Sequence, residues 1–133
     1  MKLKLSLAAA ALALASLPAL AHHSFAAEYD SSKPVTKKGK FVKMDWVNPH
    51  SWIFFEVTDD SGKAATWRAE ALPPNGLYRQ GWRPNSLKAG EPITVTGFLA
   101  KDGDNLMWSQ SVVNGEGKRM FAGAAEGEGA PKQ

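Results

Sequence analysis

The three histidines of this chain stand at two places, His22-His23 and His50, and imidazole is a common metal ligand. If export processing frees the α-amine of His22, that amine and the Nδ1 of its own ring could chelate one ion. The ordinary pKa of an α-amine is about 7.7–8.0, so a metal can displace its proton near neutral pH. His50 would add a third nitrogen in a T-shaped arrangement. Nitrogen-rich tetragonal sites suit Cu(II), so the pattern predicts a copper site formed by His22 and His50, with His23 able to replace either.

A simpler interpretation of the same residues stays open. His22 and His23 could be unligated residues that follow a cleavage site, and His50 could cap a break between strands by bonding to backbone. Processing one residue earlier would begin the chain Ala21-His22-His23, which places a histidine third, another pattern that binds copper. Both processing variants favour copper. The cleavage position therefore affects the predicted geometry of the site more than it affects the predicted metal.

An export leader is predicted over residues 1–21. Lys2 and Lys4 precede an apolar run from Leu5 to Leu17, and Ala19-Leu20-Ala21 supplies a small-residue cleavage signal. The apolar run is shorter than a transmembrane helix usually requires. We therefore expect a periplasmic or secreted protein with no membrane span after cleavage.

The composition of the processed chain argues against a nucleic-acid partner. Cleavage would leave 112 of the 133 residues, enough for one domain with one core. The full sequence has 16 Lys+Arg and 13 Asp+Glu, and losing Lys2 and Lys4 leaves 14 against 13. A chain so close to neutral lacks the basic surface that nucleic acids require. It has no cysteine, so it must be stable without disulfides.

The histidine of the Asn-Pro-His turn is positioned by two predicted strands within Gly39–Val57. On both sides of Asn48-Pro49 the residues form period-two sets rich in aromatic and β-branched types, which is the strand signature, and proline interrupts a sheet ladder. Further strands are predicted at Ala64–Ala71, Glu91–Leu99 and Leu106–Val113, with a short sixth ending near Phe121 and one helical turn at Leu77–Gln80. This order favours an all-β fold, a five- to six-stranded OB-like barrel with a short helical insert between strands 3 and 4; an open six-stranded sandwich fits almost as well.

The predicted barrel spans residues 37–121 and is flanked by two less regular segments. Residues 22–36 form a polar N-terminal leader segment that we expect to pack locally through Phe25 and Tyr29. Residues 122–133 lack anything to bury, so a disordered tail is expected.

Tryptophans provide a second set of candidate ligand-binding residues. Trp46 and Trp52 flank the Asn-Pro-His turn, so they could shield His50 or form one wall of a pocket. Trp82, between Gly81 and Arg83, is expected at the surface beside Arg79, where the two arginines could receive a carboxylate or a phosphate. The alternative is that most of these rings fill the barrel and that the arginines are solvated.

Conventional catalytic patterns are missing from the sequence. Glu56, Glu70 and Asp45 fall on separate predicted strands, and no nucleophile elbow or phosphate-binding glycine loop is found. The chemistry therefore favours a small exported binding protein for a metal ion or small ligand, with a protein partner also open. The runner-up is a metal-free OB-type module for a peptide, a glycan or a partner protein. A copper-dependent oxidase is a third, weaker interpretation, because no second redox centre is marked.

Several blocks of the sequence carry a family resemblance. They are Ala21-His22-His23-Ser24-Phe25, Tyr29-Asp30, Trp46-Val47-Asn48-Pro49-His50-Ser51-Trp52, Pro74-Asn75-Gly76-Leu77, Gly81-Trp82, Ser86-Leu87-Lys88-Ala89-Gly90 and Ala100-Lys101-Asp102-Gly103. These blocks resemble the DUF6152 family, short exported bacterial proteins of unknown function, and the resemblance covers nearly all of the predicted mature chain. It implies an exported single-domain protein and brings no established activity. A more distant similarity to exported bacterial OB-fold proteins implies a binding module, by analogy of fold alone.

Overall fold

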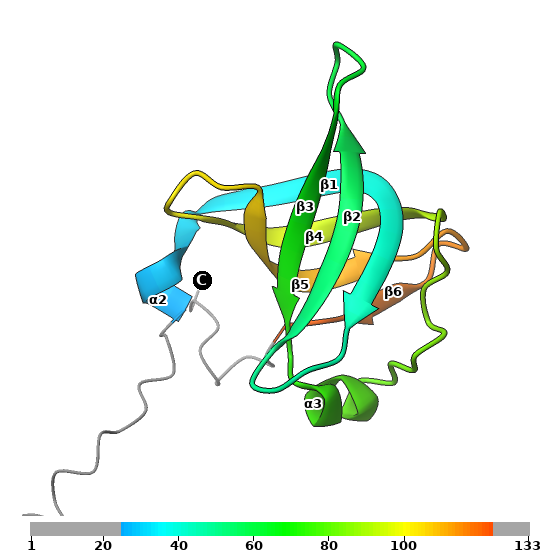
Figure 1. Cartoon of the computed structure of the whole chain (residues 1–133). Helices are drawn as coiled ribbons and strands as arrows, with labels where there is room; N and C mark the ends of the chain where they lie inside the picture. The colour runs from blue at the N-terminus through cyan, green and yellow to red at the C-terminus, as the bar shows by residue number, and fades with distance from the viewer. Residues whose placement is uncertain (1–24, 124–133) are drawn as a thin grey trace, which may run out of the picture.

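Six strands and two short helices make up the part of the chain that the structure, a computed structural model, describes, residues 25–123 (Figure 1). The strands come close to the ranges expected from the period-two alternation. In chain order the elements are α2 (Phe25–Glu28), β1 (Tyr29–Asp45), β2 (Ser51–Thr58), β3 (Ala64–Ala71), α3 (Pro74–Arg79), β4 (Pro92–Ala100), β5 (Leu106–Val113) and β6 (Arg119–Phe121).

The sheet closes on itself to form a barrel. Its strand order is β3-β2-β1-β4-β5-β6, and a further pairing joins β3 to β5. That closing pair is parallel, whereas the other pairs are antiparallel. Five strands therefore complete the ring, and β6 pairs with residues 111–113 of β5, beyond the part of β5 that pairs with β3. The predicted all-β, OB-like barrel with a short helix between its third and fourth strands is confirmed.

The hydrophobic core fills the interior of this barrel. On β2 the side chains of Ile53 and Phe55 point inward and are fully buried, while those of Trp52 and Phe54 alternate with them and are partly exposed. The alternation is what a strand with one face on a core requires. The buried members of the core are Phe41, Ile53, Phe55, Ala69, Ala71, Leu77, Trp82, Leu87, Ile93, Val95, Met107, Val112, Met120 and Ala122.

Both flanks of the predicted barrel domain differ from expectation. β1 begins at Tyr29, so the second half of the predicted leader segment is strand, which pairs with β4 at Tyr29 and again from Pro34 onward. At the other end, Ala122 and Gly123 are buried and bonded through their backbones to Gln110, so the expected loose tail does not start there. The predicted export leader and the remainder of the predicted tail lie outside the described residues.

The helices of the described region are short. α2 has four residues and α3 has six. Between positions 25 and 123, no helix has the length and apolar character needed to cross a bilayer.

Candidate functional site

His50 lies in the loop between β1 and β2, immediately before β2 begins, and follows a cis Asn48–Pro49 peptide. Its Nδ1 is in hydrogen-bonding contact with Oε1 of Glu70 on β3. Its ring also meets Trp108 edge to face, with ring centroids 6.1 Å apart and planes at 86°. The side chain keeps 26% of its surface exposed, so one edge of the imidazole reaches solvent.

Glu70 is buried, at 4% exposure, but it does not belong to the core of the barrel. Its neighbours Ala69 and Ala71 point into that core, so the alternation along β3 directs the carboxylate to the outer face. There its Oε2 accepts a hydrogen bond from the hydroxyl of Tyr29, and its backbone oxygen accepts one of 2.6 Å from Ser109 Oγ. The two carboxylate oxygens therefore have separate partners.

Aromatic rings surround this carboxylate on the outer face. The ring of Phe25 stacks on that of Tyr29 at 5.6 Å between centroids and meets those of Phe98 and Trp108 edge to face at 5.5 and 5.8 Å. Tyr29 in turn meets Trp108 at 5.8 Å. We call this group of side chains on the outer face the outer cluster. Its members are Phe25, Tyr29, His50, Glu70, Phe98 and Trp108.

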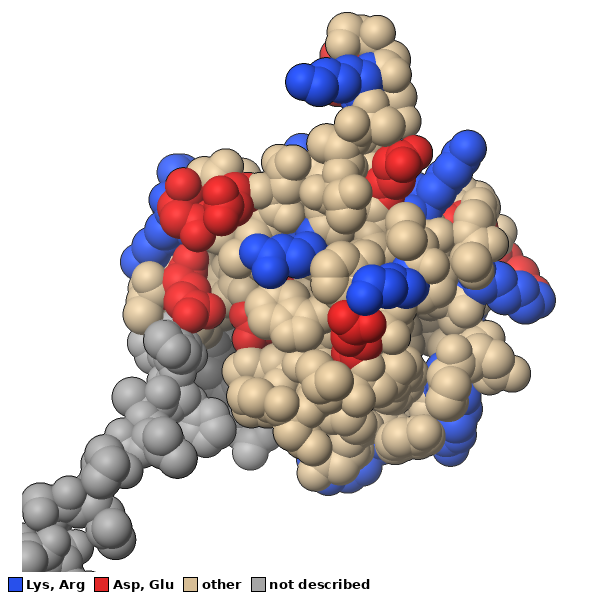
Figure 2. Space-filling model, viewed as in Figure 1, with Lys and Arg blue, Asp and Glu red and all other residues tan. Residues whose placement is uncertain are grey.

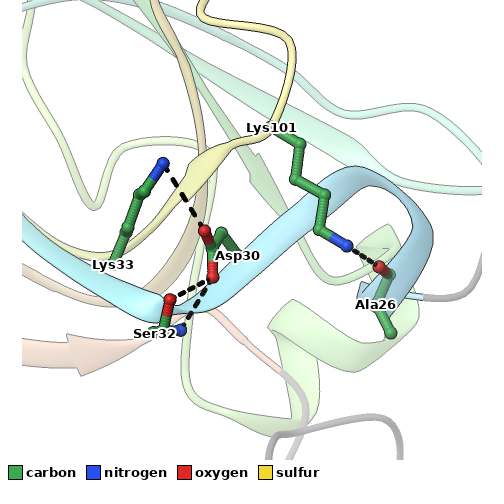
Figure 3. Close-up of polar contacts among 5 residues, drawn as sticks. All are labelled: Ala26, Asp30, Ser32, Lys33 and Lys101. Carbon is green, nitrogen blue, oxygen red and sulfur yellow. Dashed lines mark hydrogen bonds and ion pairs between the residues drawn. The ribbon is translucent and has the colours of Figure 1, made fainter.

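The segment that covers the outer cluster is tied to the hairpin between β4 and β5 (Figure 3). Lys101 donates from its Nζ to the carbonyl of Ala26 at 2.5 Å, and its backbone N–H donates to the carbonyl of Glu28 at 2.9 Å. Farther along β1, the Asp30 carboxylate accepts from the backbone and hydroxyl of Ser32 and lies 3.6 Å from the Lys33 ammonium. The two bonds from Lys101 hold the first described residues against the barrel, whereas those of Asp30 are local to β1.

Burial and hydrogen bonding favour the neutral phenol of Tyr29. Desolvation raises the pKa of this group far above its ordinary value, and the hydrogen bond to Glu70 and the negative charge of that carboxylate raise the pKa further. Tyr29 therefore stays protonated over the physiological range and acts as a fixed hydrogen-bond donor.

Two of the three predicted metal ligands, His22 and His23, lie outside the described residues. Within residues 25–123 no group of three or more histidine, cysteine, aspartate or glutamate side chains could hold a metal ion. That region contains His50 with its carboxylate partner, and it begins at Phe25, whose ring contacts the same Trp108 as His50 does.

The tryptophans expected beside His50 have other neighbours. Trp46 packs partly on the core and lies 5.4 Å from the ring of Tyr78. Trp52 points outward from β2 beneath the guanidinium of Arg68, at 5.6 Å from the ring centroid. The tryptophan that contacts the His50 ring is Trp108, which the sequence did not single out for this role.

The expected surface position of Trp82 is wrong. Its side chain is fully buried in the core, and its indole N–H donates to the carbonyl of Phe121 at 2.8 Å. A ring in that position has no face to offer a ligand. Arg79 is exposed at the end of α3, whereas Arg83 donates to the carbonyls of Tyr78 and Trp82.

Glu70 and Tyr29 were not predicted as site residues, because the residues that they contact lie far away along the chain. The sequence does contain one signal for Glu70: it stands between two alanines, Ala69 and Ala71, in a predicted strand, and all three residues are buried. A carboxylate in such a strand needs a buried partner, because an isolated buried charge is costly.

Comparison with known proteins places the chain in a family without assigning it an activity. No curated protein matches the sequence. Residues 9–107, which include β1, β2, β3 and β4, match a family of unknown function. The chain therefore belongs to the DUF6152 family.

Proposed function

We propose that this protein is a small exported copper-binding protein in which His22 and His50 hold the ion, with His23 in reserve. The observation that carries the proposal is the contact between His50 Nδ1 and the Glu70 carboxylate. A histidine that ligates a metal through one ring nitrogen commonly donates its other ring N–H to a carboxylate. His50 has that arrangement, and its partly exposed ring can receive an ion from solvent.

The start of the described chain supports the proposed pairing of His22 with His50. Phe25 follows His22 by three residues, and an extended chain spans at most about 10 Å over three residues. The rings of Phe25 and His50 lie 5.8 and 6.1 Å from the ring of Trp108. Phe25 and His50 therefore share Trp108 as a neighbour, and the short span from His22 to Phe25 supports the proposed pairing of His22 with His50.

The donor set favours copper among the ions that bind imidazole. The proposal supplies nitrogen from two imidazoles and one amine, and nitrogen-rich sites suit Cu(II). The sequence has no cysteine to offer thiolate ligands, which soft metals such as Cu(I) prefer. The proposed ion is therefore Cu(II), bound by a protein that carries it or holds it outside the cytoplasm.

Copper titration of the chain that begins at His22 tests the proposal. In the presence of a competing chelator we expect a dissociation constant below micromolar. His50→Ala should weaken binding by at least about tenfold, because even loss of an outer partner of a ligating histidine costs about 10–100-fold. A chain extended by one methionine, which blocks the α-amine, should lose affinity to a similar or greater degree.

Glu56→Leu is the control, since it removes an exposed side chain of β2 and leaves all three histidines in place. We expect it to bind copper as the parent chain does. Binding at micromolar strength or weaker that is indifferent to His50→Ala would refute the copper function. Full affinity in the methionine-extended chain would refute the terminal chelate.

A second candidate is a metal-free module that binds a glycan on the outer face of β2 and β3. The rings of Trp52 and Phe54 point outward there, and Arg68 and Lys43 lie over them at 5.6 and 4.5 Å. Oligosaccharides bind this face in OB-folds, and flat rings with adjacent polar groups suit sugars. Figure 2 shows basic and acidic side chains interspersed on the face that carries these strands, which does not favour a polyanion.

Tryptophan fluorescence with a glycan panel, recorded in EDTA, separates the two candidates. Binding that survives EDTA and is lost in Trp52→Ala supports the glycan module. Trp46→Ala is the comparison, because Trp46 lies on the far side of the loop beside Tyr78. Absence of any glycan response, together with chelator-sensitive copper binding, rejects this candidate.

A further inference from the structure

We infer that Glu70 is a positioning residue that holds the His50 ring with its proton on Nδ1, so that Nε2 is the nitrogen presented to the metal. This inference rests on the proposed copper function and specifies how the described half of that site is built. It also assigns Tyr29 a part, because Tyr29 fixes the orientation of the carboxylate.

The hydrogen-bond inventory determines the tautomer. Tyr29 donates to Oε2 of Glu70, so Oε1 is the oxygen that faces His50 Nδ1. A carboxylate oxygen accepts hydrogen bonds and has no proton to give when it is ionised. The nitrogen that faces it must therefore carry the proton, and in the neutral imidazole the other nitrogen, Nε2, then bears the free lone pair.

Two further contacts restrict movement of the pair. Ser109 Oγ bonds to the backbone of Glu70 at 2.6 Å, which ties β3 to β5 beneath the carboxylate. Trp108 stands against the His50 ring at 86°, so rotation of the imidazole about its bond to the chain would meet the indole. The carboxylate is 5% exposed whereas the imidazole is 26% exposed, so the pair is fixed at its buried end and open at the other.

This arrangement differs from a hydrogen bond that only stabilises the fold. Such a bond would fix the same tautomer, but it predicts no link between Glu70 and metal affinity. A positioning role predicts, in addition to the fixed proton, a change in affinity when the acceptor is removed, because outer partners orient ligating histidines and raise their basicity.

Nuclear magnetic resonance of the isotopically labelled, metal-free processed chain reads the tautomer directly from the two ring nitrogens. At a pH where His50 is neutral, we expect a protonated Nδ1 and a bare Nε2. Glu70→Gln keeps an acceptor oxygen for Nδ1 and can donate its amide to Tyr29, so it should retain this tautomer. Glu70→Leu removes the acceptor and should shift the ring toward the form protonated on Nε2.

Copper affinity of the same variants completes the experiment. Glu70→Leu should bind copper about 10–100-fold more weakly than the parent chain, the range for loss of an outer partner. Glu70→Gln should recover most of that loss. Glu56→Leu, which removes an exposed carboxylate from β2, is the matched control and should change neither the tautomer nor the affinity. Tyr29→Phe keeps the aromatic ring and should give an intermediate loss.

The outcomes separate the inference from the function on which it rests. A parent chain with its proton on Nε2 would overturn the inference whatever the copper result. A changed tautomer in Glu70→Leu with unchanged copper affinity would also overturn it. The expected tautomer in a parent chain that does not bind copper would overturn the proposed function and leave Glu70 as a residue that orients His50 without a metal.

Discussion

Tyr29 donates its hydroxyl hydrogen to Glu70 across 41 positions of sequence, and this bond joins the beginning of β1 to the end of β3. Both residues are buried, on the outer face of the barrel. The bond thus ties the N-terminal segment to the strand that carries the partner of His50. Disturbing it should alter both the stability of the fold and its response to pH.

Tyr29→Phe should reduce the loss of stability at alkaline pH. The folded-state pKa of Tyr29 is raised, so its protonated form contributes stability that is fully present below its ordinary pKa of about 10 and is lost as pH rises above that value. Denaturant unfolding across this range should show a steeper decline for the parent chain than for the variant. At neutral pH the variant should be less stable by about 1–3 kcal/mol, since Glu70 loses a buried donor.

Tyr78→Phe is the control for this pH dependence, because the chain has two tyrosines and Tyr78 is 45% exposed. It should follow the parent profile. Parallel alkaline declines for the parent chain and Tyr29→Phe would contradict the assigned role of the buried phenol.

Trp82→Ala should lower the free energy of unfolding by about 3–5 kcal/mol, the usual cost of removing a fully buried large aromatic side chain. The indole fills the core below α3 and satisfies the Phe121 carbonyl. Trp52→Ala, at a partly exposed outer position, should cost clearly less. Equal losses in urea titrations of the two variants would contradict the placement of Trp82 in the core.

Gly97→Ala should be strongly destabilising, because it places a methyl group against the backbone of β5. A Cβ at this position would lie 1.7 Å from the Trp108 carbonyl oxygen, and β4 has a register irregularity there. Since the obstacle is backbone, the two strands must separate. Thr96→Ala, at the adjacent position, is the control. Thermal unfolding of Gly97→Ala at the parent temperature would show that the strands approach less closely than described.

Copper should raise the thermal stability of the processed chain, and EDTA should reverse the increase. A ligand at 100 times its dissociation constant stabilises the folded state by about 2.7 kcal/mol, or roughly 10–20 °C in midpoint for a domain of this size. His50→Ala should lose most of the shift. Stabilisation of equal size in that variant would locate the copper elsewhere on the chain.

The barrel could be predicted because its central strands are rich in aromatic and β-branched residues and are bounded by turn residues. On β2 the structure places Ile53 and Phe55 inward and Trp52 and Phe54 outward. The first part of β1 was missed because it is polar on both faces: Ser32, Lys33 and Pro34 are all exposed. Tyr29 pairs with Ala100 and the ladder to β4 resumes at Pro34, so backbone groups join this part of β1 to the sheet without any apolar signal.

The sequence predicted His50 as a site residue but did not predict its contacts with Glu70 and Trp108. His50 stood out because it ends an Asn-Pro turn between two strands. Its partner Glu70 comes from β3, and the parallel pairing of β3 with β5 brings Trp108 beside Glu70. Such a parallel contact is fixed by closure of the barrel, so local periodicity carries no information about it. Trp82 was predicted at the surface because its neighbours Gly81 and Arg83 are small or charged, and both are exposed. Its burial in the core likewise has no local signal in the sequence.

Trp108 has one further neighbour, Gly123, where a Cβ would lie 3.1 Å from the indole Nε1. Both ends of the described chain, Phe25 and Gly123, therefore converge on a single side chain of β5. Nearby ends allow circular permutation, and the exposed turn at residues 59–63 offers a place to open the chain. A permutant joined near Trp108 would keep the barrel while removing the proposed terminal chelate, and so would separate folding from the proposed metal binding in one molecule.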